Sequence, residues 1–138
     1  MPPAATISVV GRTDNLPVVM QFVQDYWLTA GLPPDSLFAF ELVLEEVFMN
    51  IAMHGSTPIR SPNVDIQVEL AKGKVTLTVS DDGPAFNPLS VPPPDLEAPI
   101  EVRSVGGLGI HLLRQMMESV DYERSGRRNK LQMSRRVS

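Results

Sequence analysis

The 138-residue chain lacks several features that would assign it to a well-known class. It has no cysteine, which excludes disulfide bonds and any zinc site built on cysteine. It has no run of 18 apolar residues, and its first residues, MPPAATISVV, have no basic segment before a long apolar one. A net charge of −4 argues against broad contact with nucleic acid. We therefore expect a soluble, cytoplasmic protein that contacts neither membranes nor nucleic acid directly.

What is present is the composition of an ordinary globular protein, with 43% hydrophobic and 20% charged residues. The length fits one domain over residues 1–138. Residue spacing predicts strands at 6–10, 64–70, 74–80, 119–124 and 130–135, and helices at about 15–29, about 35–54 and after Gly109. Asp14 or Asn15, and Asp35 or Ser36, are the expected helix caps. This order predicts an α/β (α+β) two-layer sandwich, with a mixed, mainly antiparallel sheet and helices on one face.

The second predicted helix carries Glu46 and Asn50, which are four residues apart and project from one side of it. On a helical wheel that side lies roughly opposite the apolar stripe of Phe40, Leu44, Val47 and Ile51. The pair is equally compatible with an exposed i,i+4 contact and with the lining of a cavity. In a cavity, the asparagine carbonyl could bind Mg²⁺ and the carboxylate could orient or deprotonate a hydroxyl.

The stretch SDDGPAFNP, residues 80–88, directly follows the central hairpin. Asp81, Asp82 and Gly83 are typical of a turn, in which acidic side chains bond nearby amides. A buried carboxylate at a strand end can also accept a hydrogen bond from an exocyclic amine such as that of adenine, with Gly83 letting the base come close. The residues alone leave both interpretations open.

Three glycines, Gly106, Gly107 and Gly109, precede the third predicted helix in VGGLGIHLL. They fit a tight turn, or a helix start whose backbone amides meet phosphate. Neither the common nucleotide P-loop nor the dinucleotide fingerprint fits, because no Gly-Lys-Ser/Thr occurs and the glycines follow a long loop.

Taken together, E-x-x-x-N (Glu46, Asn50), D-x-G-x-x-F (Asp81, Gly83, Phe86) and G-G-L-G-I resemble one known family. This order is similar to the ATP-binding (GHKL, HATPase_c or Bergerat) fold of gyrase, Hsp90, histidine kinases and MutL. It most closely resembles the serine/threonine kinase branch of anti-sigma factors such as RsbW and SpoIIAB. The likeness extends from ELVLEEVFMNIAMHG to the C-terminus.

The resemblance implies a role for each matching residue. Asn50 is expected to coordinate Mg²⁺, Asp81 to bind the adenine amine beside Gly83, and Glu46 to act as the general base. Arg103 is expected to contact the γ-phosphate, and the proline-rich segment 87–105 to form the ATP lid. The remaining nucleotide-binding residues are expected to be Phe86, Gly106, Gly107, Leu108, Gly109 and Ile110. The two histidines, His54 and His111, are expected to be structural.

The implied function is an ATP-dependent serine/threonine kinase that phosphorylates a STAS-type anti-sigma-factor antagonist and regulates a sigma factor by partner switching. Glu46 favours this enzyme, because a protein that only binds nucleotide needs Asn50 and Asp81 but no base. The alternative is a nucleotide-dependent binding regulator with little or no kinase activity. A homodimer is compatible with the apolar helix faces and with the family likeness.

Overall fold

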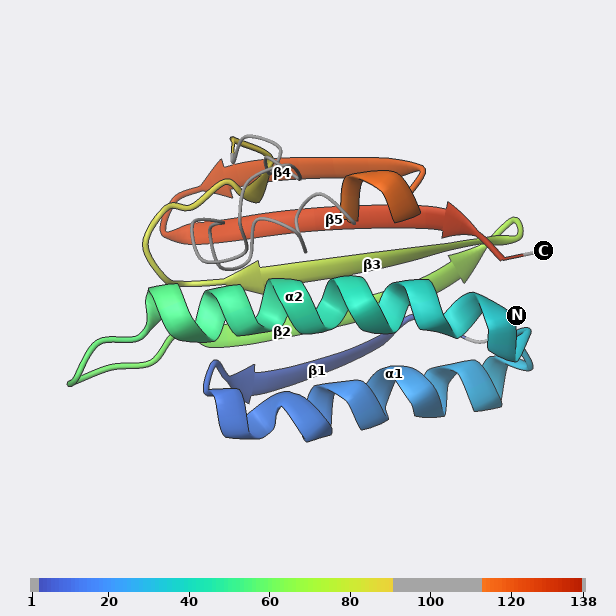
Figure 1. Cartoon of the computed structure of the whole chain (residues 1–138), viewed down its shortest axis with the longest axis horizontal. Helices are drawn as coiled ribbons and strands as arrows, with labels where there is room; N and C mark the ends of the chain where they lie inside the picture. The colour runs from blue at the N-terminus through green and yellow to red at the C-terminus, as the bar shows by residue number, and fades with distance from the viewer. Residues whose placement is uncertain (1–2, 91–112, 138) are drawn as a thin grey trace, which may run out of the picture.

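The computed structural model describes residues 3–90 and 113–137. The described strands are β1 (Ala5–Val10), β2 (Asn63–Ala71), β3 (Lys74–Asp81), β4 (Ser119–Ser125) and β5 (Arg128–Arg136). They form one sheet in the order β1-β2-β3-β5-β4, in which each of these pairings is antiparallel. Helices α1 (Leu16–Ala30) and α2 (Leu37–Gly55) pack beside each other on the sheet (Figure 1). The two-layer sandwich expected from the sequence, with helices on one face of the sheet, is confirmed. The expectation of a mixed sheet is wrong for the described strands: β2–β3 and β4–β5 are hairpins, and the chain also returns antiparallel where β1 meets β2 and β3 meets β5.

The helices begin and end close to the expected residues, but their caps differ from the prediction. Asn15 and Ser36 precede α1 and α2, and neither makes a side-chain cap hydrogen bond. Both have right-handed helical backbone angles, because a short 3₁₀ turn leads into each helix, whereas a capping side chain needs an extended residue. At the other end of α1, Gly31 adopts φ 65° and its N–H donates to the Leu28 carbonyl, which is a glycine C-cap.

Both predicted hairpins are present, and the first one positions the end of β3. Lys72 and Gly73 have φ values of 54° and 74°, as a two-residue type I′ turn requires. The turn sets a register in which Asp81, the last residue of β3, lies opposite Val64 on β2. On its other side β3 pairs with β5, and there Asp81 lies opposite Asn129.

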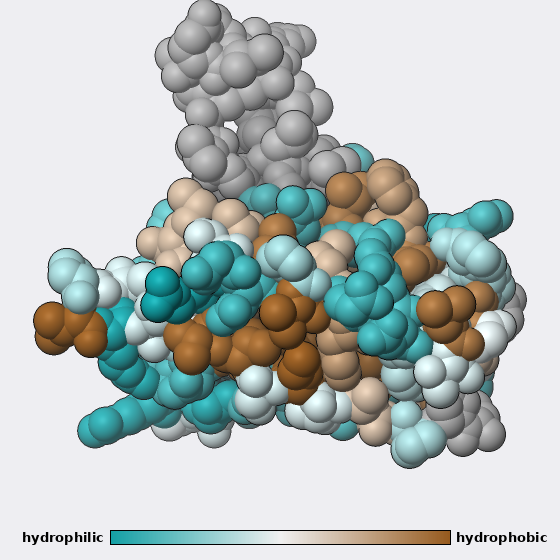
Figure 2. Space-filling view, turned by 90° about the horizontal axis from the view of Figure 1, so that it is seen from below, coloured by the Kyte–Doolittle hydropathy of each residue, from teal (hydrophilic) through white to brown (hydrophobic). Residues whose placement is uncertain are grey.

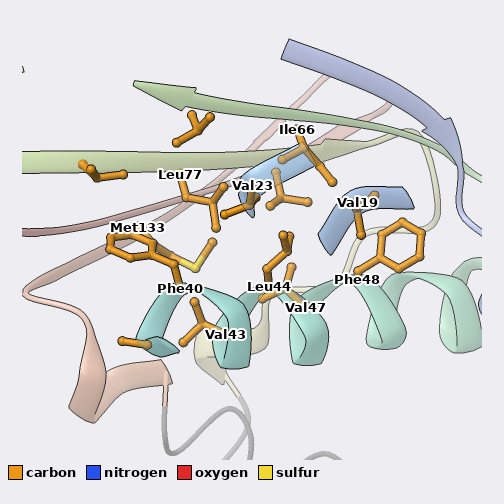
Figure 3. Packing of buried hydrophobic residues seen from close by; sticks show 14 of the residues in the cluster. Val19, Val23, Phe40, Val43, Leu44, Val47, Phe48, Ile66, Leu77 and Met133 are labelled. Atoms are coloured by element: carbon orange, nitrogen blue, oxygen red, sulfur yellow. The ribbon is translucent and has the colours of Figure 1, made fainter. Parts of the chain in front are cut away.

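The hydrophobic core lies between the two helices and one face of the sheet, where α2 supplies Phe40, Val43, Leu44, Val47 and Phe48 (Figure 3). α1 adds Val19 and Val23, and the strands add Ile66, Leu77 and Met133 (Figure 3). Residues 113–116 are also helical, and Leu113 is fully buried in this core. Alternate strand residues reach the core because successive side chains point to opposite faces of a sheet.

The side of the molecule that carries α1 and β1 is partly apolar. Figure 2 views the molecule from this side, the lower one in Figure 1, and hydrophobic residues gather near its middle. Val10, Val18 and Leu28 on these two elements are 42%, 46% and 82% exposed. Among the helices that the structure describes, none combines the length and apolar character needed to cross a membrane.

Candidate nucleotide-binding site

A cavity of about 200 Å³ opens at the end of the sheet where β3 finishes. The C-terminal half of α2 forms one wall, and β3, β4 and β5 form its floor. The loop after β3 forms the other wall. Its lining side chains are Val47, Asn50, Ile51, His54, Val79, Asp81, Pro84, Ala85, Phe86, Pro88, Tyr122, Asn129 and Leu131, together with Gly55.

Asp81 is the buried carboxylate of this cavity, with only 6% of its surface exposed. Its Oδ1 accepts hydrogen bonds from the Gly83 N–H at 2.9 Å and from Nδ2 of Asn129 at 3.1 Å. Within the described part of the chain, no protein group donates to its second oxygen, Oδ2. A carboxylate can accept several hydrogen bonds, so Oδ2 can bind a donor on a ligand.

Asp81 both accepts the hydrogen bond of the Gly83 N–H that closes the bend after β3 and lines the cavity, so the two interpretations of the sequence are compatible. Gly83 lies so close to Asp81 that a Cβ atom on it would be 3.0 Å from Oδ1. Asp82 points elsewhere: it accepts hydrogen bonds from the Asn63 amide and pairs with Arg60. Burial alone would raise the pKa of Asp82, but these hydrogen bonds and the Arg60 charge lower it below its usual value.

Glu46 and Asn50 lie one turn apart on α2, and both are half-buried. Nδ2 of Asn50 donates to Oε1 of Glu46 at 3.2 Å, so the i,i+4 contact is confirmed. Asn50 also lines the cavity beside Val47 and Ile51, and therefore does not lie opposite the core stripe. The cavity borders the edge of the core. At about 100° per residue, Asn50 projects roughly 60° around α2 from Val47 and roughly 100° from Ile51, so all three side chains can line it.

The pKa of Glu46 is raised. Burial away from water is the main cause, and the negative charge of neighbouring Glu45 adds to it. The hydrogen bond from Asn50 acts in the opposite direction and only partly offsets burial. A carboxylate with a raised pKa is a stronger base than one in water, so Glu46 is better suited to accept a proton than an exposed glutamate.

His54 and Phe86 form an aromatic pair at the rim. Their ring centroids are 5.8 Å apart with an interplanar angle of 19°, which is a stacked arrangement. His54 is in the last turn of α2, as expected from the sequence. Phe86 is 40% exposed, a large fraction for an aromatic side chain that lines a cavity. The pair thus presents flat aromatic surface where the cavity opens.

Asn129 and Tyr122 also line the cavity and were not predicted from the sequence. A usable signal exists for Asn129, because it shares the inward face of β5 with Leu131 and Met133. A buried polar residue in such an alternating pattern indicates a hydrogen-bond partner. Tyr122 gives no comparable signal in the sequence.

Several predicted residues lie outside the described residues. These are Arg103, Gly106, Gly107, Leu108, Gly109, Ile110 and His111, together with most of the expected lid. Of the predicted site residues that are described, Asn50, Asp81 and Phe86 line one cavity, Gly83 adjoins Asp81, and Glu46 is bonded to Asn50.

The described residues fit part of a nucleotide. A volume of about 200 Å³ is below the roughly 300–1,000 Å³ of typical ligand pockets, so the cavity suits a base rather than a whole nucleotide. Its apolar walls and single buried carboxylate match a flat ring with an amine. Asn50 can offer its carbonyl oxygen to Mg²⁺, because its amide nitrogen already donates to Glu46. The described residues contain no group of three or more histidine or acidic side chains able to hold a metal by themselves, so a Mg²⁺ ion bound here would take most of its ligands from phosphate and water.

Comparison with known proteins matches this chain to an ATPase domain. The model of the histidine kinase-like ATPase domain family matches residues 9–135. Serine/threonine-protein kinase BtrW of Bordetella bronchiseptica is 28% identical over 87 residues, which are 63% of this chain and 61% of that kinase. The chain therefore aligns with less than two thirds of this relative's length.

Solved structures share the fold at low sequence identity. The RsbU and RsbW domains of Rv1364c from Mycobacterium tuberculosis match with a TM-score of 0.71 and 13% identity, covering 99% of this chain and 33% of that one. Histidine kinase AdeS of Acinetobacter baumannii matches with a TM-score of 0.50 and 14% identity, covering 99% of this chain and 69% of that one. At these identities the likeness shows the fold alone.

Proposed function

The chain belongs to the histidine kinase-like ATPase domain family, and on this basis we propose that it is an ATP-binding, anti-sigma-factor-like serine/threonine kinase. An ATPase domain implies ATP as its ligand. The finer assignment draws on the 28% identity to a serine/threonine-protein kinase and on the motifs of the sequence.

Asp81 is the residue we assign to base recognition. Its Oδ2 accepts a hydrogen bond from the exocyclic amine of adenine, while Oδ1 stays bonded to the protein. Gly83 keeps the turn close to this carboxylate, and Phe86 covers the ring at the rim. The single observation that carries the proposal is this buried carboxylate, held at one oxygen beside an apolar cavity of base size.

Phosphate binding is assigned to Asn50 and to the residues that match the glycine motif. Asn50 supplies a carbonyl oxygen to Mg²⁺, which when bound neutralises charge on the phosphates. The family likeness assigns the phosphates to backbone amides of Gly106, Gly107, Leu108, Gly109 and Ile110, with Arg103 at the γ-phosphate. These assignments stay proposals, since residues 91–112 are not described.

Glu46 is the proposed general base of phosphoryl transfer. It accepts the proton of a serine or threonine hydroxyl on a partner protein as that oxygen bonds to the γ-phosphorus, and ADP leaves. Its raised pKa makes it a suitable acceptor, and its bond to Asn50 places it one helical turn from the proposed metal ligand. The reaction mainly requires positioning and charge neutralisation, which this arrangement supplies.

The proposed phosphorylation substrate is a STAS-type anti-sigma-factor antagonist, and the regulated partner is a sigma factor. We also propose a cytoplasmic location and no direct contact with membrane or nucleic acid. A homodimer would be formed on the partly apolar side of α1 and β1, where β1 is an edge strand with no charged residue. Sedimentation velocity tests the dimer.

The alternative is a nucleotide-dependent binding regulator with little or no kinase activity. Isothermal titration with ATP, with and without Mg²⁺, tests the nucleotide site that both functions share. Phosphate transfer from labelled ATP to a purified STAS-domain antagonist separates them: transfer lost in Glu46→Gln supports the kinase. ATP binding without transfer to any tested antagonist supports the regulator.

A further inference from the structure

Asn129 is a fully bonded asparagine at the floor of the cavity, and only 5% of its surface is exposed. Its Nδ2 donates to Oδ1 of Asp81 at 3.1 Å and to the Pro84 carbonyl at 2.9 Å. Its Oδ1 accepts from the Phe86 N–H at 3.2 Å and from the Tyr122 hydroxyl. Two donors and two acceptors therefore use the full capacity of the side-chain amide.

This network has only one orientation. The Pro84 carbonyl can only accept and the Phe86 N–H can only donate, so a flipped amide would lose both bonds. One side chain of β5 thereby holds the end of β3 and two points of the loop after it. Tyr122, from β4, adds a further constraint on the same amide.

The consequence concerns the carboxylate of Asp81. Because Asn129 and the Gly83 N–H both donate to Oδ1, the carboxylate cannot rotate without losing two hydrogen bonds. Asp81 lines the cavity, and Oδ2, which has no donor among the described residues, is left as its acceptor for a ligand. An acceptor in a fixed position favours a base with an amine and disfavours one with a carbonyl oxygen at the same position.

We infer that Asn129, supported by Tyr122, is a positioning residue that sets the selectivity of the site for adenine over guanine nucleotides. It acts through Asp81 and through the loop wall, without a required contact to the nucleotide. The inference rests on the proposed function, since it presumes that Asp81 reads the base. Purine selectivity follows because adenine carries an amine at the ring position where guanine carries a carbonyl.

The first test is Asn129→Asp, which keeps the shape but replaces the donating NH₂ with an acceptor. Both bonds from Nδ2 are lost, and a second carboxylate faces Asp81. We expect ATP to bind roughly tenfold to a hundredfold more weakly at pH 8, with the preference for ATP over GTP reduced by a similar factor. Isothermal titration with ATP and with GTP measures both.

A pH series tests whether the hydrogen bond donated from residue 129 to Asp81 is what the substitution removes. Two carboxylates at this distance share a proton well above their usual pKa, and the shared proton restores a donor to Asp81. The ratio of variant to wild-type Kd for ATP should therefore fall as pH is lowered from 8 through the upper pKa of this pair of carboxylates. Among the residues that the structure describes, His54, Tyr122 and Arg124 are the other ionisable groups next to this pair. They are present in both proteins, so wild-type protein measured at each pH is the control for them and for ATP itself.

Two tyrosine variants keep the inference testable if Asn129→Asp does not fold. Tyr122→Phe removes one hydroxyl bonded to Asn129, and Tyr26→Phe removes one hydroxyl bonded to the Leu70 N–H, remote from the cavity. We expect only Tyr122→Phe to reduce the ATP-to-GTP preference, by about threefold or more, with the thermal stability of both variants lowered alike.

The outcomes separate the inference from the proposed function. Unchanged selectivity in Asn129→Asp and Tyr122→Phe, with wild-type protein binding ATP, overturns the inference and leaves the ATP site intact. A constant Kd ratio across the pH series also overturns it. If wild-type protein binds neither ATP nor GTP, the proposed function itself fails, and the inference with it.

Discussion

Replacing Asp81 with asparagine tests base recognition with the smallest possible change. The substitution keeps the size of the side chain and exchanges one carboxylate oxygen for an NH₂ group. Two protein donors, the Gly83 N–H and Nδ2 of Asn129, meet at the Oδ1 position. They require an acceptor there, so the asparagine must place its carbonyl at Oδ1 and its NH₂ toward the cavity.

The expected magnitude follows from this orientation. The adenine amine loses a hydrogen bond to a charged acceptor, which contributes about 1.5–3 kcal/mol, and meets a donor instead. The Kd for ATP should therefore rise about tenfold to a hundredfold. Guanine has a carbonyl at that position, so the affinity for GTP should rise relative to the affinity for ATP. The two bonds inside the protein persist in neutral form, so we expect unfolding to cost about 1 kcal/mol less and Tm to fall by about 3–5 °C.

Isothermal titration with ATP and GTP, with circular dichroism for stability, measures these effects. Asp82→Asn is the matched control, because its carboxylate bonds Asn63 and Arg60, and neither of these two lines the cavity. Its ATP affinity should stay within about twofold of wild type. Wild-type affinity in Asp81→Asn would refute base recognition by this carboxylate. Equal losses of ATP affinity in both variants would show that binding depends on the shape of this turn and not on the carboxylate charge of Asp81.

Three further predictions concern other parts of the molecule. Asn50→Ala should remove the Mg²⁺-dependent part of ATP binding, and titration showing an intact Mg²⁺ effect would exclude it as a ligand. Glu46→Gln should bind ATP normally and transfer phosphate slowly, without a lower Tm, because it removes a partly buried charge whose pKa is raised. Wild-type transfer should fall as pH decreases, with a midpoint above the usual glutamate value of 4.5, since the base must be ionised, and Glu46→Gln should lack this limb. Ser36→Ala should lower the free energy of unfolding by about 1–2 kcal/mol, because it leaves the buried Trp27 indole N–H without its acceptor. Ser8→Ala, which removes an exposed hydrogen bond, should cost less than about 0.5 kcal/mol in fluorescence-monitored unfolding, and equal losses would contradict this reasoning.

Much of the fold could be predicted because its signals are local. The Lys72-Gly73 turn requires positive φ angles at both residues, and Gly31 ends α1 for the same backbone reason. Alternating and helical spacing of apolar residues then identifies strands and helices. The predicted caps of α1 and α2 were wrong. A 3₁₀ turn precedes each helix, and whether such a turn forms depends on how the chain enters the helix layer.

The neighbour of β3 could not be predicted in this way. The closing hairpin is evident in the sequence, but either of its strands could pair with β3. β5 takes this place, and its inward side chains Leu131 and Met133 are both buried. This choice depends on packing between segments more than 40 residues apart along the chain, which no local pattern reports.

By itself, the sequence therefore determined the secondary structure, the sandwich architecture and three motifs typical of one ATPase family, because these depend on spacing and turn chemistry. Only the tertiary structure decided that Asn129 lies against Asp81, since the β3–β5 register joins residues 48 apart along the chain. It also decided that Asn50 lies beside Val47 and Ile51 at one cavity. A site is made where separate elements meet, and here the pairing of β3 with β5 brings Asn129 to a carboxylate that the local bend at Gly83 holds from its other side.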